Sequence, residues 1–169
     1  MRAASPPASL AMLLAHEAGL RASAICQFSR QNCDFERRWL RGKTKGGVNY
    51  SVPMTQRLHE RLLFACTAAS PNEPLLTAVS YQRKPCAVEN LDYHVRQAKR
   101  RAGIETPWTL HDLRRAAARR VYERTHDVRK VQRLLSHKNL STTMWYLGDA
   151  GAEIDAEDLE TTKSKEKIA

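Results

Sequence analysis

The sequence predicts a mostly helical α+β domain with a small antiparallel β-sheet. Apolar residues recur through most of the chain at the three- and four-residue spacing of amphipathic helices. Residues 35–52 depart from that spacing, because two strand-like segments there enclose a turn rich in glycine and lysine. The length of 169 residues suits one domain with a sizeable core.

The amino-terminal half is predicted to contain three helices and one hairpin. Its elements are, in order, a leader over residues 1–9, a helix from residue 10 to near residue 19, a short helix over 23–28, hairpin strands over 35–40 and 48–52, and a helix over 54–69. Leu10, Leu13 and Leu14 supply the apolar face of the first helix, and Gly19 is suited to end it. Pro71 stops the last helix, because proline cannot continue the hydrogen-bond ladder.

The carboxy-terminal half is predicted to be helical after an irregular segment. Its elements are the irregular segment over 71–87, a basic amphipathic helix over 88–102 closed by Gly103, a helix around residue 111, a helix over 128–135, a segment over 142–147 and a detached tail over 149–169. Thr109 is the expected N-cap of the helix around residue 111, and Asp112 completes a capping box with it. Leu113, Ala117 and Val121 are expected to form the buried stripe of that helix.

The charge of the chain points to a polyanionic partner. The chain holds 28 Lys and Arg against 18 Asp and Glu, for a formal net charge of +10. Residues 149–169 hold seven of the acids and three of the lysines, so the remainder carries +14. Nucleic acid is the commonest partner of so basic a body, and a merely solvated basic surface is the alternative.

The cysteine and hydropathy patterns exclude several other classes of protein. The cysteines form no Cys-x-x-Cys pair and no zinc-ligand spacing, so neither a metal nor a cofactor is expected; they are Cys26, Cys33, Cys66 and Cys86. No signal peptide is recognisable, and no apolar run reaches the roughly 18 residues of a membrane span. Reduced cysteines and a cytoplasmic location follow as expectations.

The most informative residues lie between positions 111 and 146. His111 and Arg114 are three apart, so a helix places them on one face. His137 and an exposed-looking Tyr146 are nine apart with a polar turn between them, which allows a second segment to bring both to the same place. These side chains suit phosphoryl transfer, in which a hydroxyl attacks and cations hold the phosphate oxygens.

This spacing resembles the catalytic domain of the tyrosine recombinase (phage integrase) family. The second box of that family is His-x-x-Arg, and its third is a histidine followed nine residues later by the nucleophilic tyrosine. Glu17-Ala18-Gly19-Leu20-Arg21 resembles the Gly-Leu-Arg of the first box, and residues 42–53 resemble the family's lysine hairpin. The resemblance covers about residues 10–148, and the family's amino-terminal DNA-clamping domain is expected to be absent from this chain.

The resemblance implies a metal- and ATP-independent DNA strand transferase that works through a 3′-phosphotyrosyl intermediate. The implied catalytic residues are Arg21, Lys45, His111, Arg114, His137 and Tyr146. Tyr146 is the nucleophile, Lys45 protonates the leaving 5′-oxygen, and the others hold phosphate oxygens or take the proton of the tyrosine. Lys45 is chosen over Lys43 by counting back seven residues from Val52. Further DNA contacts are expected from basic residues of the hairpin and the His111 helix, namely Arg41, Lys43, Arg115 and Arg119.

Two positions depart from the family pattern. Ala24 stands three residues after Arg21, where an acidic residue is common, and this leaves the orientation of Lys45 and His111 open. Ser136 stands where a glycine often precedes the histidine of the third box. Two alternative functions also stay open. One is a catalytically idle DNA-binding fragment of a decayed mobile element, and the other is DNA relaxation like that of a type IB topoisomerase.

The resemblance also implies partners. Double-stranded DNA is the expected substrate, with no small-molecule cofactor and no membrane. In the family, the segment after the tyrosine commonly packs on a neighbouring protomer as a tetramer assembles on DNA. Here that segment is acidic over residues 149–160 and then lysine-rich, with Ile154 and Leu159 as large apolar residues. We expect a monomer or weak dimer in free solution and a homo-oligomer on DNA.

Overall fold

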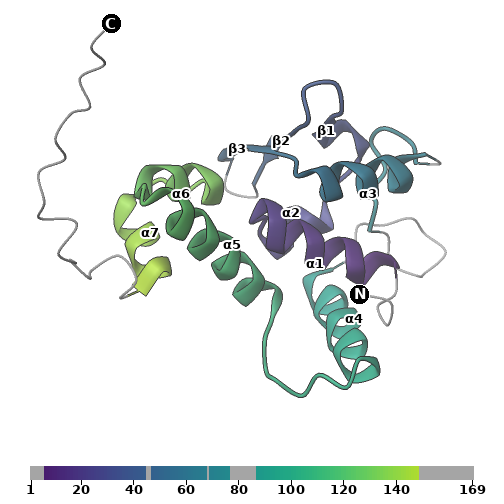
Figure 1. The fold of residues 1–169 in the computed structure, drawn as a ribbon. Helices are drawn as coiled ribbons and strands as arrows, with labels where there is room; N and C mark the ends of the chain where they lie inside the picture. The colour runs from purple at the N-terminus through teal and green to yellow at the C-terminus, as the bar shows by residue number, and fades with distance from the viewer. Residues whose placement is uncertain (1–5, 45–46, 68, 77–86, 149–169) are drawn as a thin grey trace, which may run out of the picture.

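Helices make up most of the computed structural model, which describes residues 6–44, 47–67, 69–76 and 87–148 (Figure 1). The helices are α1 (Pro6–Ala18), α2 (Ala22–Cys26), the 3-10 helix η1 (Arg30–Asn32), α3 (Gln56–Cys66), α4 (Val88–Arg101), α5 (Leu110–Thr125), α6 (Val128–Leu135) and α7 (Leu140–Leu147). The strands are β1 (Cys33–Asp34), β2 (Trp39–Lys43) and β3 (Asn49–Pro53). This is the mostly helical α+β architecture that the sequence predicts.

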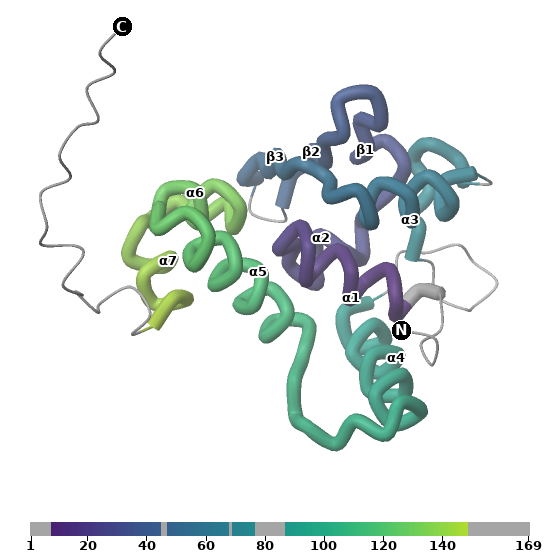
Figure 2. The backbone as a smooth tube through the Cα atoms, in the orientation of Figure 1, coloured from purple at the N-terminus to yellow at the C-terminus, as the bar shows by residue number. Residues whose placement is uncertain are grey.

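Helix α1 lies near the centre of the molecule and packs against α3, α4 and α5 (Figure 2). The sheet lies on one side of α1 and α4 on the other, while α5, α6 and α7 gather at one end. Two buried clusters occur among the described residues. The larger, around Leu14, Ile25 and Leu58, joins α1 to α4 and the sheet. The smaller joins α5, α6 and α7 through residues that include Val131 and Leu135.

The first helix begins earlier than predicted and ends where predicted. It starts at Pro6, inside the expected leader of residues 1–9, because the first turn of a helix tolerates proline, whose missing N–H would have no helical partner there. It ends before Gly19, which has a left-handed φ of 61°. A Cβ at Gly19 would lie 3.3 Å from Cγ of Leu134, so both the conformation and the close approach of α6 favour glycine.

The sheet has the order β1-β2-β3, and both pairs are antiparallel. The predicted hairpin is present, with Leu40 opposite Val52, but its first strand begins at Trp39 rather than at residue 35. Residues 35–38 instead form a turn, in which Arg38 adopts a left-handed φ of 57°. Strand β1 was not predicted, because a strand of two residues is too short to show alternation.

Helix α5 has the predicted cap but a different buried stripe. Its buried residues are Leu110, Arg114, Ala117 and Ala118, whereas Leu113 and Val121 are only half-buried. Ala117 is therefore the one member of the predicted stripe that is buried, and Arg114, predicted as a catalytic residue, lies in the interior beside it. The predicted irregular segment over 71–87 and the tail over 149–169 lie largely or wholly outside the described residues. None of the described helices is long and apolar enough to cross a membrane.

Candidate active site

Helix α5 presents His111 and Arg114 from its first two turns. The Thr109 side chain accepts a hydrogen bond from the backbone N–H of Asp112, and the Asp112 carboxylate accepts one from the N–H of Thr109 at 2.9 Å. The bonds from Thr109 lower the pKa of Asp112. This capping box fixes where the helix begins, and therefore sets the directions of His111 and Arg114.

Arg114 is held in the interior by backbone carbonyls. Only 3% of its surface is exposed. Nη1 donates to the carbonyl of Gly19, and Nη2 donates to the carbonyl of Leu135 at 2.7 Å. Nε has no hydrogen-bond partner among the described residues. Burial, followed by repulsion from Arg21, lowers the pKa of Arg114 to about 10, with Tyr146 acting in the opposite direction. The guanidinium therefore remains charged at neutral pH.

His137 follows α6, which ends at Ser136 in a left-handed conformation (φ 49°, ψ 48°). The N–H of His137 donates to the carbonyl of Gln132 at 3.1 Å, and the Gln132 side chain donates back to the carbonyl of His137 at 3.1 Å. The ring lies between two partners, with Nε2 3.3 Å from Nη2 of Arg114 and Nδ1 3.1 Å from Oγ1 of Thr143. Burial, followed by the neighbouring arginines, lowers the pKa of His137 to about 4.

Tyr146 is buried on α7, with 7% of its surface exposed, so the expectation of an exposed tyrosine was wrong. Its hydroxyl oxygen lies 3.4 Å from Nδ1 of His111. Its ring centroid lies 5.2 Å from that of His111 and 5.0 Å from that of His137. The guanidinium carbon of Arg114 lies 5.9 Å from the same ring. One phenol is thus enclosed by two imidazoles and a guanidinium.

Arg21 joins this cluster from α2, where it is the N-cap residue. It lowers the pKa values of both Arg114 and His137, which places its charge near them. A hollow of about 340 Å³ opens beside it, lined by Arg21, Ser23, Thr44, Val48, Ser136, His137, Lys138, Asn139 and Thr142. The structure therefore brings together five of the six predicted catalytic residues: Arg21, His111, Arg114, His137 and Tyr146.

The sixth, Lys45, lies outside the described residues. Its described neighbours Thr44 and Val48 line the same hollow as Arg21 and His137. Ala24, which replaces a commonly acidic residue, is buried in α2.

The residues predicted to contact DNA divide into two groups. Arg115 and Arg119 line a second hollow, of about 540 Å³, together with Tyr146. The guanidinium carbon of Arg115 lies 5.6 Å from the ring centroid of Trp145, which is 68% exposed. In the hairpin, Arg41 pairs with Asp34 at 3.5 Å, and Lys43 is exposed at the end of β2. All four are basic side chains at or near the surface, as phosphate contacts require.

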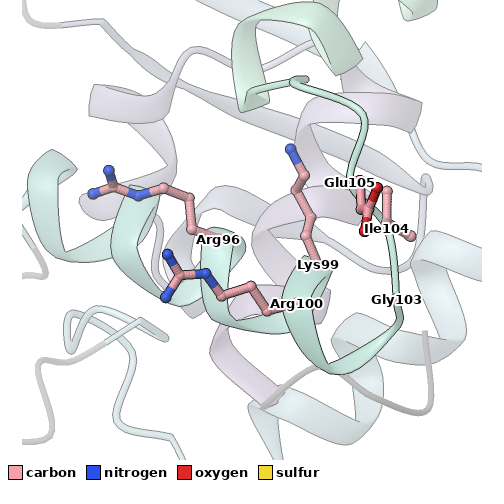
Figure 3. Close-up of a pocket in the computed structure, with 6 residues that line it drawn as sticks. All are labelled: Arg96, Lys99, Arg100, Gly103, Ile104 and Glu105. Carbon is pink, nitrogen blue, oxygen red and sulfur yellow. The ribbon is translucent and has the colours of Figure 1, made fainter.

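A third hollow, of about 440 Å³, lies at the carboxy-terminal end of α4 (Figure 3). Arg96 and Arg100 are one helical turn apart on α4, and both line this hollow. Lys99 is occupied differently, since its Nζ donates to the carbonyl of Trp108 at 2.9 Å and lies 4.7 Å from the indole centroid. This contact ties α4 to the segment that leads into α5.

Sequence reasoning missed Thr143 and Lys138 at the site. Thr143 contacts His137, and its spacing of three residues from Tyr146 on one helix is the signal that identifies it. Lys138 lines the hollow beside Arg21, and its position directly after His137 is its only sequence signal. Within the described ranges, no group of three or more His, Cys, Asp or Glu side chains is arranged to hold a metal ion.

The sequence matches the Phage integrase family over residues 2–152. It is 31% identical over 163 residues to the tyrosine recombinase XerA of Thermococcus kodakarensis, an alignment that covers 94% of this chain and 55% of that protein. It is 31% identical over 141 residues to XerA of Pyrococcus furiosus, covering 81% of this chain and 48% of that protein. The chain thus spans about half the length of the curated relatives it matches.

Solved structures share the fold. A crystal structure of XerA recombinase has a TM-score of 0.67 at 21% identity, covering 86% of this chain and 60% of that one. A lambda integrase dimer bound to a COC′ core site has a TM-score of 0.65 at 26% identity, covering 88% of this chain and 44% of that one.

Proposed function

The chain belongs to the phage integrase family, and we propose that it cuts and rejoins double-stranded DNA as the catalytic domain of a site-specific tyrosine recombinase. The observation that carries the proposal is the enclosure of Tyr146 by His111, His137 and Arg114. The relatives support it by name, since XerA is a tyrosine recombinase and the lambda integrase dimer is bound to a core site.

Tyr146 attacks the scissile phosphorus through its hydroxyl oxygen. A bond forms between that oxygen and phosphorus, and the bond from phosphorus to the 5′-oxygen breaks, which leaves a 3′-phosphotyrosyl link and a 5′-hydroxyl. His111 accepts the phenolic proton, a role supported by the 3.4 Å between its Nδ1 and the hydroxyl oxygen. Its alternative role is a hydrogen bond to a phosphate oxygen. The link conserves the energy of the phosphodiester, so rejoining requires neither ATP nor a metal.

Arg21, Arg114 and His137 hold the nonbridging phosphate oxygens. A guanidinium stays charged and offers five N–H donors, which match the oxygens of a phosphate. In Arg114 the carbonyls of Gly19 and Leu135 occupy part of this set and fix the plane of the group, while Nε keeps its donor free among the described residues. One such donor contributes about 3 kcal/mol of transition-state stabilisation.

Lys45 protonates the departing 5′-oxygen. The placement of Thr44 and Val48 in the wall of the hollow beside Arg21 supports this role. The N–H of Thr44 also donates to the carbonyl of Val48 at 2.8 Å, so both ends of the loop meet at the site. We expect Lys45→Ala to abolish cleavage and Lys43→Ala to retain it. A duplex with sulfur in place of the bridging 5′-oxygen is expected to restore cleavage by Lys45→Ala, because a thiolate leaving group needs no proton.

A nicked suicide duplex tests the proposal directly. When a nick lies close to the cleaved phosphate, the short strand with the new 5′-hydroxyl diffuses away, and the protein stays covalently attached to DNA. We expect the wild-type chain to form such an adduct from a pool of nicked duplexes with random central sequence, detected on a denaturing gel. Tyr146→Phe forms none, whereas Tyr93→Phe, a matched change at a 53% exposed tyrosine of α4, keeps the reaction.

The outcomes separate this function from its alternatives. If the chain binds DNA but forms no adduct with any duplex, the proposal is contradicted, and the alternative of a catalytically idle DNA-binding fragment is supported. An adduct that survives Tyr146→Phe contradicts the assignment of the nucleophile. Relaxation of supercoiled plasmid without exchange of strands between duplexes supports the type IB topoisomerase alternative.

We also propose that the chain assembles as a homo-oligomer on DNA through its tail, residues 149–169, which lies outside the described residues. Docking Ile154 and Leu159 on a neighbour contributes about 3 to 5 kcal/mol before the cost of ordering the segment. A solution mass with and without duplex, for the full chain and for a chain ending at Gly148, tests it. Equal assembly of both chains on DNA contradicts the role of the tail.

A further inference from the structure

Each ring nitrogen of His137 contacts a side chain: one is Arg114, which can only donate hydrogen bonds, and the other is Thr143, whose hydroxyl can donate or accept. Nε2 lies 3.3 Å from Nη2 of Arg114, and Nδ1 lies 3.1 Å from Oγ1 of Thr143. His137 is 8% exposed and Thr143 is completely buried. Thr143 and Tyr146 are three apart on α7, so the helix that carries the attacking hydroxyl also carries the hydroxyl that contacts His137.

The contact with Arg114 decides which nitrogen of His137 carries the proton. A guanidinium has donors and no acceptor, so Nε2 faces it as an acceptor and carries no hydrogen. In a neutral imidazole the proton then lies on Nδ1, which donates to Oγ1 of Thr143. A neutral ring is also what its surroundings favour, since burial and the two arginines lower the pKa of His137 to about 4.

This state is the wrong one for the proposed reaction. To donate to a nonbridging phosphate oxygen, Nε2 must carry a proton, either by a change of tautomer or by gain of a second proton beside the phosphate. The hydroxyl of Thr143 is compatible with every such state, because it accepts from a protonated Nδ1 and donates to an unprotonated one. A methyl group at this place can do neither.

We propose that Thr143 is a positioning residue that holds His137 through Nδ1 in each protonation state that the reaction requires of the ring. The inference rests on the proposed function for its catalytic consequence, and on the geometry of His137 for its effect on the ring. Thr143 acts through the histidine and has no contact of its own with the phosphate.

Two substitutions test it. Thr143→Val removes the hydroxyl at nearly constant volume, and Thr143→Ser keeps it. In the full chain at pH 7.5, imidazole ¹⁵N spectra are expected to show His137 protonated at Nδ1 in the wild type and in Thr143→Ser. In Thr143→Val the Nδ1 resonance is expected to shift, because its proton loses the hydroxyl that accepts it. Ser141→Ala, which removes an exposed hydroxyl on the same helix, leaves the spectrum unchanged.

Single-turnover adduct formation on the suicide duplex gives the second measurement. Thr143→Val is expected to form the adduct about tenfold more slowly, the effect of one buried hydrogen bond, and to shift the pH profile of the rate. Thr143→Ser recovers the rate toward wild type. Thr143→Ala serves in place of the valine variant if that variant does not fold.

The spectra and the adduct rates test the inference independently of each other. A His137 spectrum that is the same in wild type and Thr143→Val overturns the proposal, as does a wild-type rate and pH profile in Thr143→Val. If the wild-type chain forms no adduct, the proposed function fails, and the spectra alone decide whether Thr143 holds Nδ1 of His137.

Discussion

Replacing Ser136 by glycine is expected to stabilise the protein. Ser136 caps α6 in the left-handed conformation (φ 49°, ψ 48°), and none of the described residues makes a hydrogen bond to its side chain. That conformation costs a residue with a Cβ about 1 to 2 kcal/mol. Glycine does not incur this cost, but it loses about 0.5 to 1 kcal/mol more backbone entropy on folding. The net expected gain is about 0.5 to 1 kcal/mol.

Urea unfolding and calorimetry measure this gain. For a chain of this size, the midpoint of thermal unfolding is expected to rise by about 2 °C. Ser136→Ala is the matched control, because it removes the same hydroxyl but keeps the Cβ, and it is expected to show no gain. Ser141→Gly controls for glycine itself, and lies in helical backbone, where glycine destabilises by a few tenths of a kcal/mol. If Ser136→Gly is no more stable than Ser136→Ala, backbone strain at the cap is not the reason that glycine suits this position.

Three further predictions concern the site. Arg114→Ala is expected to lower the free energy of unfolding by about 2 to 5 kcal/mol, because it leaves the carbonyls of Gly19 and Leu135 unpaired, and urea unfolding measures it. The pKa of His137 lies at about 4 in the folded state against 6.5 for the free side chain, so the unfolded state binds the proton more readily between these values. Stability is therefore lost as the pH falls from 6.5 toward 4, by up to about 3 kcal/mol, and His137→Gln flattens this part of the curve. Arg119→Gln is expected to reduce the slope of log affinity against log salt by about 0.9, as titrations of a labelled duplex would show.

Local sequence signals were sufficient for the elements that depend on neighbouring residues. The capping box of Thr109 and Asp112 joins residues three apart, so the pattern of residue types alone identified it. The ends of α1 and α4 followed in the same way from Gly19 and Gly103, both of which have left-handed φ values. Strand β1 depends on pairing with β2 and carries no periodicity of its own, so no local pattern predicted it.

Which side chains of the site are buried depends on contacts between residues remote in sequence, so local sequence patterns did not predict it. The buried stripe predicted for α5 left out Arg114, because an arginine on a helix ordinarily reaches water. It is buried because Gly19 and Leu135, distant along the chain, supply its acceptors. Tyr146 was taken as exposed for a similar reason, and its burial arises from packing among α5, α6 and α7.

The same two carbonyls give Arg114 a role that extends beyond its own charge. Gly19 lies two residues before Arg21, and Leu135 lies two residues before His137. The guanidinium therefore hydrogen-bonds to the backbone just before Arg21 and just before His137. In the proposed reaction a change at Arg114 removes one phosphate donor, and it is also expected to loosen the backbone that orients Arg21 and His137. Because residues that act as a unit lose activity non-additively, Arg114→Ala combined with His137→Ala is expected to slow adduct formation little more than Arg114→Ala alone. Losses that simply multiply in the double variant would show that Arg114 acts on the phosphate independently of its neighbours.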